Sequence, residues 1–176
     1  MEIEILNFIQ QNLVNPVLSA IMIFCTRIVE HGEIWILAAV IMLITKKYRK
    51  VGVMVLIAVV LTFVSGELLI KNLVCRPRPF LANPDVQLLI SPPSGYSFPS
   101  SHSAVSFASA TVIFCFNKKF GTGAYVLAVL IAFSRIYLYV HYPTDVLCGA
   151  ILGVAWALIV VLLYKYGVKR FSKRKA

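Results

Sequence analysis

Residues 134–145 read SRIYLYVHYPTD and lie between two long apolar runs. His141 and Asp145 are four residues apart, a spacing that places both on one face of a helix. Pro143 suits the first turn of a helix, so we expect a helix to begin near Tyr142, with Asp145 in its first turn. A carboxylate close to one imidazole nitrogen fixes the tautomer and leaves the other nitrogen free to attack or to accept a proton. Ionisable groups at membrane depth are costly, so this stretch predicts a functional site.

The composition of the chain indicates an integral membrane protein. Its 176 residues are 60% hydrophobic and only 14% charged, and the mean hydropathy is +0.85. A soluble domain of this length usually carries more charge and fewer unbroken apolar runs. We see no internal repeat and no linker, so we expect one membrane-embedded domain over residues 1–176.

The apolar runs predict an all-α membrane protein with six transmembrane helices. A short helix at residues 3–13 mixes apolar and amide side chains and suits the membrane interface. The first two predicted spans are short for a membrane core of about 30 Å. The expected spans are residues 16–29, 34–44, 51–70, 101–116, 123–139 and 145–164. The proline-rich stretch at 75–99 is expected to form a loop over the site.

The basic residues predict how the chain lies in the membrane. The net charge is +10, but twelve of the 17 basic residues fall in three clusters at the ends of apolar runs, at 46–50, 118–119 and 165–175. This is the positive-inside pattern, which also favours anionic lipids at the cytoplasmic face, and it argues against nucleic acid as a partner. With six spans, all three clusters lie on the cytoplasmic side of the plasma membrane. Both termini are then predicted to be cytoplasmic and the polar site extracytoplasmic.

Three polar stretches are expected to meet at that outer face: KNLVCRPRPF at 71–80, GYSFPSSHS at 95–103, and residues 134–145. Serines at a helix start cap free amides, and that end of a helix attracts anions. The residues expected to bind an anion or to react with it are Lys71, Arg78, Ser100, Ser101, His102, Arg135, His141 and Asp145.

Fixed cations with little acid nearby predict a compact, multiply charged anion, and phosphate fits best. Guanidinium groups bind phosphate oxygens bidentately and stabilise a five-coordinate transition state. Two histidines allow one to attack phosphorus while the other protonates the leaving oxygen. No Asp/Glu cluster suited to magnesium or zinc lies on that face, so we expect chemistry without a metal or another cofactor.

These residues resemble the three-part signature of the type 2 phosphatidic acid phosphatases, the integral-membrane lipid phosphate phosphatases. The matches are Lys71 to Arg78-Pro79, Pro99 to His102, and Ser134-Arg135 with His141 and Asp145. The resemblance implies that His141 is the nucleophile that forms a phosphohistidine, that Asp145 orients it and that His102 is the general acid. It also implies that Lys71, Arg78, Ser100, Ser101 and Arg135 hold the phosphate.

Some members of that family recycle the undecaprenyl pyrophosphate carrier of cell wall synthesis, which makes this lipid the expected substrate. Phosphatidylglycerophosphate and phosphatidic acid are close alternatives, as is transfer of the phosphoryl group to an acceptor other than water. A lipid-phosphate binder or transporter that does not hydrolyse its ligand is a further alternative, and the oligomeric state is left open.

Three positions carry separate expectations. The family usually has glycine where this chain has Ser101, so the loop geometry or headgroup preference is expected to differ. Arg76 is expected to be a solvated loop charge, with contact to phosphate as the alternative. Glu67, one turn before Lys71, is expected to neutralise that lysine, with a catalytic role as the alternative.

Overall fold

The computed structural model describes the backbone of residues 1–173 and the side chains of residues 1–167. Within that range it contains helices and no strand. The helices are α1 Glu2–Asn12, α2 Pro16–Arg27, α3 Glu33–Ile44, α4 Arg49–Phe63, the π-helix η1 Val64–Ile70, α5 Lys71–Val74, α6 Pro79–Ala82, α7 Ser101–Phe116, α8 Lys118–Tyr137 and α9 Pro143–Lys173. The all-α prediction is confirmed.

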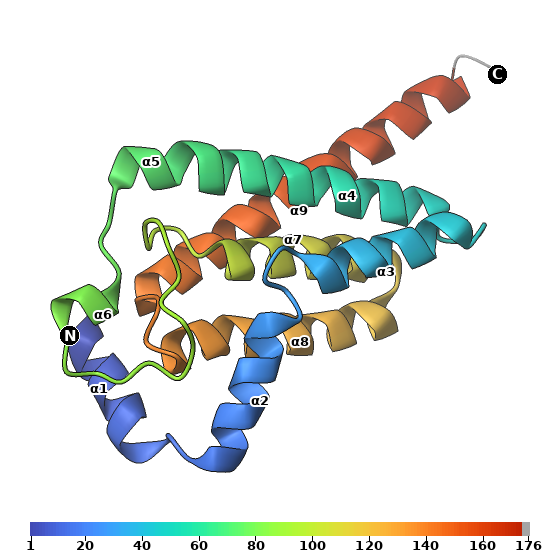
Figure 1. Cartoon of the computed structure of the whole chain (residues 1–176). Coiled ribbons are helices and arrows are strands. Elements are labelled where there is room, and N and C mark those ends of the chain that lie inside the picture. The colour runs from blue at the N-terminus through green and yellow to red at the C-terminus, as the bar shows by residue number, and fades with distance from the viewer. Residues whose placement is uncertain (174–176) are drawn as a thin grey trace.

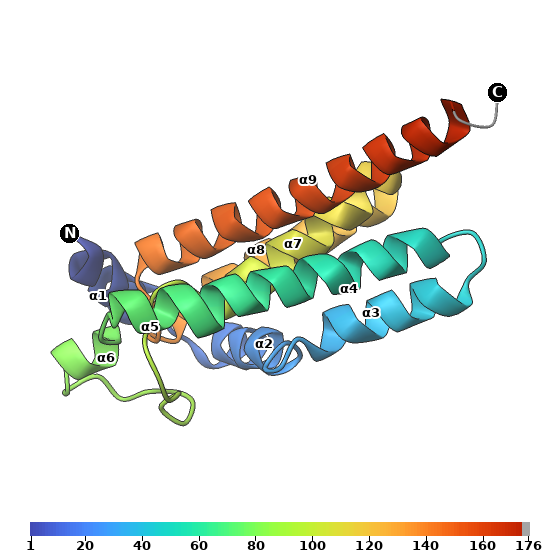
Figure 2. The same ribbon diagram turned by 90° about the horizontal axis from the view of Figure 1, so that it is seen from above.

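The core of the bundle is α7, which packs against α4, α8 and α9 (Figures 1 and 2). Its buried residues are small, including Ala104, Ala108 and Ser109, which are fully buried. Small residues let helices approach closely, and helix association in a membrane depends on such packing. The neighbouring α9 supplies the matching glycines. A Cβ atom at Gly149 would lie 2.5 Å from the carbonyl oxygen of Ser100, and one at Gly153 would lie 2.0 Å from that of Ala104.

Three stretches are long and apolar enough to cross a membrane, at residues 49–82, 118–137 and 143–167, while α2, α3 and α7 are shorter apolar helices. The predicted first span at 16–29 forms a helix but runs across the end of α8 rather than along it (Figure 1). Ser19 of α2 is hydrogen-bonded to the Tyr137 hydroxyl at 2.9 Å and Thr26 to Arg135. Two residues of α2 that are seven positions apart thus contact Tyr137 and Arg135 at the end of α8, and a sixth crossing is not confirmed.

The two ends of the described chain lie at opposite ends of the bundle (Figures 1 and 2). Glu2 of α1 contacts Thr144 at the start of α9, whereas α9 runs from there to the far end. The prediction that both termini lie on one side is therefore not confirmed. Both α1 and α2 stay at the end of α8 where residues 135–137 lie, so no helix returns the chain before α3.

The basic clusters gather at the end opposite α1. Tyr48 lies beside Lys47 and accepts a hydrogen bond from Asn117 at 3.1 Å, which joins the α3–α4 turn to the α7–α8 turn. Phe116 stacks edge-on against Tyr164, which joins the same region to α9. The side chains of Lys169, Arg170 and Lys173, and all of Arg174 and Lys175, lie outside the described residues.

Candidate active site

The turn after α8 places His141 beside Arg135. Tyr139 has a positive φ of 60°, a left-handed conformation that commonly ends helices. The chain therefore folds back, and the backbone N–H groups of Val140 and His141 both donate to the carbonyl oxygen of Arg135 at 3.2 Å. His141 becomes buried, with 2% of its surface exposed. The predicted start of a helix beyond His141 is confirmed, since Pro143 is the first residue of α9.

Asp145 is fully buried and its Oδ2 atom faces the His141 imidazole. Oδ2 lies 3.6 Å from Nδ1 of His141 and accepts hydrogen bonds from the Tyr142 N–H at 2.8 Å and the Ser97 hydroxyl at 2.5 Å. The Ser97 hydroxyl also lies 3.4 Å from Nδ1, so it bridges the two side chains. Ser97 lies in the stretch GYSFPSSHS but was not among the residues predicted to form the site.

Arg78 contacts the other imidazole nitrogen, with its Nη1 atom 3.3 Å from Nε2 of His141. A guanidinium group can only donate hydrogen bonds. Nε2 must therefore accept, and the neutral imidazole carries its proton on Nδ1, which faces Asp145. Arg78 itself is held by carbonyl oxygens, those of Gly95 at 3.0 Å, Ser94 at 2.9 Å and Val140 at 3.1 Å.

Burial keeps the His141 imidazole neutral. Desolvation lowers the pKa of His141 far below its ordinary value of 6.5, and the positive charges of Arg135 and Arg78 lower it further, while Asp145 opposes this. Burial disfavours the charged form of any imidazole. At neutral pH the imidazole is therefore neutral, and its Nε2 atom is unprotonated.

The first turn of α7 carries Ser100, Ser101 and His102. The Ser100 hydroxyl caps the helix by accepting from the backbone N–H of Ser103 at 3.5 Å, and it also accepts from the Ser103 hydroxyl at 3.0 Å. The backbone N–H of Ser100 donates to the carbonyl oxygen of Asp145 at 3.0 Å. These bonds fix α7 against α9. His102 is partly exposed, and Lys71, Arg78, Arg135 and His141 all lie close enough to act electrostatically on its imidazole.

Lys71 reaches the site from the end of the π-helix η1. Its ammonium group is bound to Glu67 at 2.6 Å and lies 3.4 Å from the Ser101 hydroxyl, which itself donates to Glu67. The expectation that Glu67 neutralises Lys71 is thus confirmed. A π-helix often occurs at functional sites, and here it presents an acidic and a basic side chain to the same serine.

Arg135 is buried, with 3% of its surface exposed, and one of its groups has no partner. Its Nη1 atom donates to the Thr26 hydroxyl, but Nε has none. A buried donor without a partner is unfavourable, and a bound anion would satisfy it.

Arg76 does not lie free in solvent as expected. It is 2.6 Å from Asp145 and 2.6 Å from Glu2.

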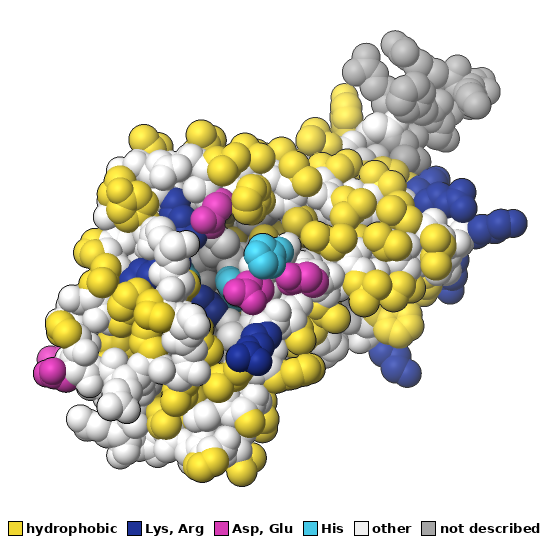
Figure 3. Space-filling model, in the orientation of Figure 1, with side chains coloured by type: hydrophobic (Ala, Val, Ile, Leu, Met, Phe, Trp, Pro, Cys, Tyr) yellow, Lys and Arg dark blue, Asp and Glu magenta, His cyan; other side chains and the backbone are white. Residues whose placement is uncertain are grey.

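The structure therefore gathers the eight predicted residues at one end of the bundle. Figure 3 shows histidine, acidic and basic side chains close together on one face of the molecule, with hydrophobic side chains over much of the surface around them. Within the described part of the chain, no three His, Cys, Asp or Glu side chains are grouped so as to hold a metal ion. The functional roles of the eight residues stay predictions.

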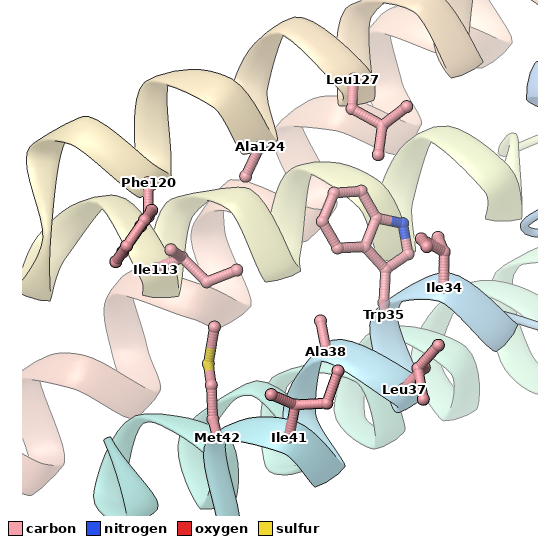
Figure 4. A pocket seen from close by; sticks show the side chains of 10 residues that line it. All are labelled: Ile34, Trp35, Leu37, Ala38, Ile41, Met42, Ile113, Phe120, Ala124 and Leu127. Atoms are coloured by element: carbon pink, nitrogen blue, oxygen red, sulfur yellow. The ribbon is translucent and has the colours of Figure 1, made fainter. Parts of the chain in front are cut away.

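An apolar groove lies between α3 and α8 and contains none of the predicted site residues (Figure 4). Its volume is about 310 Å³, within the range of small-ligand sites. Trp35 at its edge donates to the Ser106 hydroxyl at 2.9 Å, one turn along α7 from His102. The lining residues are Ile34, Trp35, Leu37, Ala38, Ile41, Met42, Ile113, Phe120, Ala124 and Leu127.

Comparison with known proteins shows the family to which the chain belongs. Residues 36–169 match the PAP2 superfamily, and the chain belongs to that family. It is 34% identical over 155 residues to an undecaprenyl-diphosphatase of Sulfolobus acidocaldarius, with 86% of this chain and 72% of the relative aligned. It is 31% identical over 144 residues to the undecaprenyl-diphosphatase BcrC of Bacillus subtilis, with 80% and 72% aligned. The crystal structure of LpxE from Aquifex aeolicus matches with a TM-score of 0.77 at 26% identity, covering 91% of this chain and 94% of that one. The protein is thus a membrane phosphatase of the PAP2 class, and the resemblance stated from the three motifs is confirmed.

Proposed function

We propose that this protein hydrolyses undecaprenyl pyrophosphate to undecaprenyl phosphate through a phosphohistidine at His141. One observation carries the proposal. The buried, neutral imidazole of His141 has its Nδ1 toward Asp145 and its unprotonated Nε2 toward Arg78. An oriented base beside fixed cations is the arrangement that attack on a phosphoryl group requires.

In the proposed reaction, Nε2 of His141 attacks the terminal phosphorus, and the bond between phosphorus and the leaving oxygen breaks. Lys71, Arg78 and Arg135 stabilise the charge on the phosphoryl oxygens. His102 gives its proton to the leaving oxygen, which departs with the lipid phosphate. His102 then takes a proton from water, whose oxygen attacks phosphorus and releases inorganic phosphate from His141. Ser100 and Ser101 are proposed to donate to the same oxygens, which for Ser101 requires its hydroxyl to leave Glu67.

The substrate is inferred from two kinds of support. Two relatives with 31–34% identity over most of this chain are named undecaprenyl-diphosphatases. The apolar groove beside α3 could also accept part of a long hydrocarbon chain whose phosphate end lies near His102. Phosphatidylglycerophosphate and phosphatidic acid remain alternatives, since the polar residues contact only the phosphate end.

We infer that residues 1–176 form one domain in the plasma membrane, with the site on the extracytoplasmic side. The positive-inside rule supports this, because the basic turns lie at the end away from the site. Anionic lipids would then face those turns on the cytoplasmic side. Since Glu2 lies at the site end, the N-terminus is inferred to be extracytoplasmic and the C-terminus cytoplasmic.

The test is phosphate release by the purified protein from a panel of lipid monophosphates and pyrophosphates in excess chelator. We expect undecaprenyl pyrophosphate to give the highest kcat/KM, with activity retained in the chelator and inhibited by vanadate. His141→Ala should abolish turnover while the thermal unfolding curve is retained. Turnover by that variant would refute the nucleophile. Binding without phosphate release would favour a binder or transporter, and phosphorylated acceptor in the presence of a lipid alcohol would favour transfer.

A further inference from the structure

The second residue of the chain is connected to the catalytic carboxylate through a single arginine. Arg76 donates from Nη1 to Oδ1 of Asp145 at 2.6 Å and from Nη2 to Oε2 of Glu2 at 2.6 Å. Charge-assisted bonds of this length are among the stronger interactions in proteins. The guanidinium group therefore joins two carboxylates, one in the site and one on the N-terminal helix.

The other oxygen of Glu2 binds the helix that carries Asp145. Oε1 of Glu2 accepts from the backbone N–H of Thr144 at 3.1 Å and from its hydroxyl at 2.7 Å. Thr144 lies in the first turn of α9, where free N–H groups favour a carboxylate. The guanidinium of Arg76 also stacks on the ring of Tyr142, 3.9 Å from its centre.

Glu2 is held in place by the helix to which it belongs. Leu6 of α1 is fully buried against the turn after α8, and Ile9 is 93% buried. Gln10 donates to the carbonyl oxygen of Tyr137 at 2.6 Å, and the Tyr139 hydroxyl is hydrogen-bonded to Asn7 at 2.7 Å. The helix α1 is thus fixed to the same turn that positions His141.

The two oxygens of Asp145 have different partners. Oδ1 binds Arg76, while Oδ2 binds Ser97 and the Tyr142 N–H on the side of His141. With Oδ1 occupied, the carboxylate cannot rotate away from the imidazole. Because Glu2 shares the guanidinium charge, Arg76 can hold Asp145 without cancelling its negative charge toward His141.

We propose that Glu2 and Arg76 are positioning residues, which hold Asp145 in the orientation that keeps the proton of His141 on Nδ1. Neither is proposed to contact the phosphate. This inference rests on the proposed roles of His141 and Asp145. It extends the active site to the N-terminal helix, which lies outside the part of the chain that matches the family.

Several charged or titratable groups face the side chains of His141 and Asp145, and the test must separate their effects from that of Arg76. Around His141 they are Asp145 from α9, Arg78 from the segment before α6, Arg135 from α8 and His102 from α7. Around Asp145 they are Arg76 and His141, together with Tyr142.

The test compares Arg76→Gln, Glu2→Gln and the double variant in the full-length protein, with Glu4→Gln as a matched control. Glu4 lies on the same helix, but its carboxylate is paired with the N-terminal amine at the exposed surface. For each protein, kcat and KM are measured from pH 4 to 9, and thermal unfolding is recorded. Arg76→Lys is added because it keeps the charge but not the two-pronged geometry.

We expect Arg76→Gln to lower kcat by between about tenfold and about a hundredfold, as loss of a charged hydrogen bond implies. The KM should change little. The acid limb of the pH–rate profile should move to higher pH, since removing a nearby cation raises the pKa of an imidazole. Glu2→Gln should have a smaller effect of the same kind. The double variant should equal Arg76→Gln, because glutamine can still accept hydrogen bonds from Thr144, and the carboxylate charge that is removed acts on Asp145 through Arg76. Arg76→Lys should return the acid limb to its wild-type pH but should not restore kcat.

Three outcomes would overturn the proposal. A raised KM with unchanged kcat in Arg76→Gln would make Arg76 a phosphate-binding residue. Loss of activity that follows only the loss of thermal stability, with an unchanged acid limb, would make the contact structural. Additive effects in the double variant would separate Glu2 from Arg76. Full activity in His141→Ala would instead refute the proposed nucleophile, so the two failures are distinguishable.

Discussion

Gly149 allows the start of α9 to lie directly against the start of α7, and we expect its replacement by alanine to damage catalysis more than stability. A Cβ atom at this position would lie 2.5 Å from the carbonyl oxygen of Ser100. Ordinary van der Waals contact begins at 3.4 Å, so the two backbones must separate locally by about 0.9 Å. Ser100 precedes His102 by two residues, and its N–H is bound to the carbonyl oxygen of Asp145. The displacement therefore falls between the proposed general acid and the carboxylate.

The expected magnitudes follow from two opposing effects on folding and one on catalysis. Overpacking costs about 1–3 kcal/mol, while alanine is favoured over glycine in a helix by about 1 kcal/mol. The net loss of unfolding free energy should therefore be at most about 2 kcal/mol. A misplacement of about 1 Å can lower a catalysed rate by about a hundredfold. We therefore expect kcat to fall by up to about a hundredfold in a protein that still folds.

Two other glycines provide matched controls for this experiment. A Cβ atom at Gly123 of α8 meets nothing within 4 Å, so Gly123→Ala should leave kcat unchanged and stabilise slightly. A Cβ atom at Gly121 would lie 2.2 Å from the Cα atom of Phe114, at the end of the bundle away from the site. Gly121→Ala should lower thermal stability while the folded fraction keeps its kcat. The assay is phosphate release per folded molecule together with thermal unfolding in detergent. Unchanged kcat in Gly149→Ala, or an equal loss in Gly121→Ala, would refute this reasoning.

Two further predictions concern the histidines. The native state holds His141 neutral because burial lowers its pKa, whereas the unfolded chain takes up a proton near pH 6.5. The free energy of unfolding should therefore fall as the pH drops below about 6.5, by up to about 1.4 kcal/mol per pH unit. This dependence should be weaker in His141→Asn. Chemical denaturation at several pH values measures both. Replacing His102 by alanine should lower kcat strongly for a lipid substrate but only weakly for an aryl phosphate, whose leaving oxygen needs no proton. Equal losses for both substrates would argue against His102 as the general acid.

The site could be predicted from the sequence because its residue types have few alternative uses in an apolar chain. Histidine, arginine and lysine at membrane depth require partners, and the spacing of His141 and Asp145 matched the start of a helix. The residues that hydrogen-bond to these predicted side chains were not predictable in this way. Ser97 and Thr26 are small polar residues common in any sequence, and only the folded chain shows that one bridges His141 to Asp145 and the other binds Arg135.

The all-α architecture was predictable from the length of the apolar runs, but the direction of α2 was not. Residues 16–29 are apolar enough for a spanning segment, and periodicity carries no information on how a helix lies relative to its neighbours. The orientation is set by the contacts of Ser19 and Thr26 with the end of α8. The predicted side of the N-terminus depended on counting that helix as a crossing, so the two predictions stand or fall together.

The π-helix η1 has a consequence for comparing this chain with its relatives. Its i→i−5 hydrogen bonds accommodate one residue more than an α-helix would over the same stretch, and each residue of an α-helix turns the chain by about 100°. A homologue lacking one residue between Val64 and Ile70 can therefore present its lysine on the same helix face as Lys71, and a sequence alignment needs room for a single gap there. The same deletion within α4 would turn that lysine away from the proposed phosphate site.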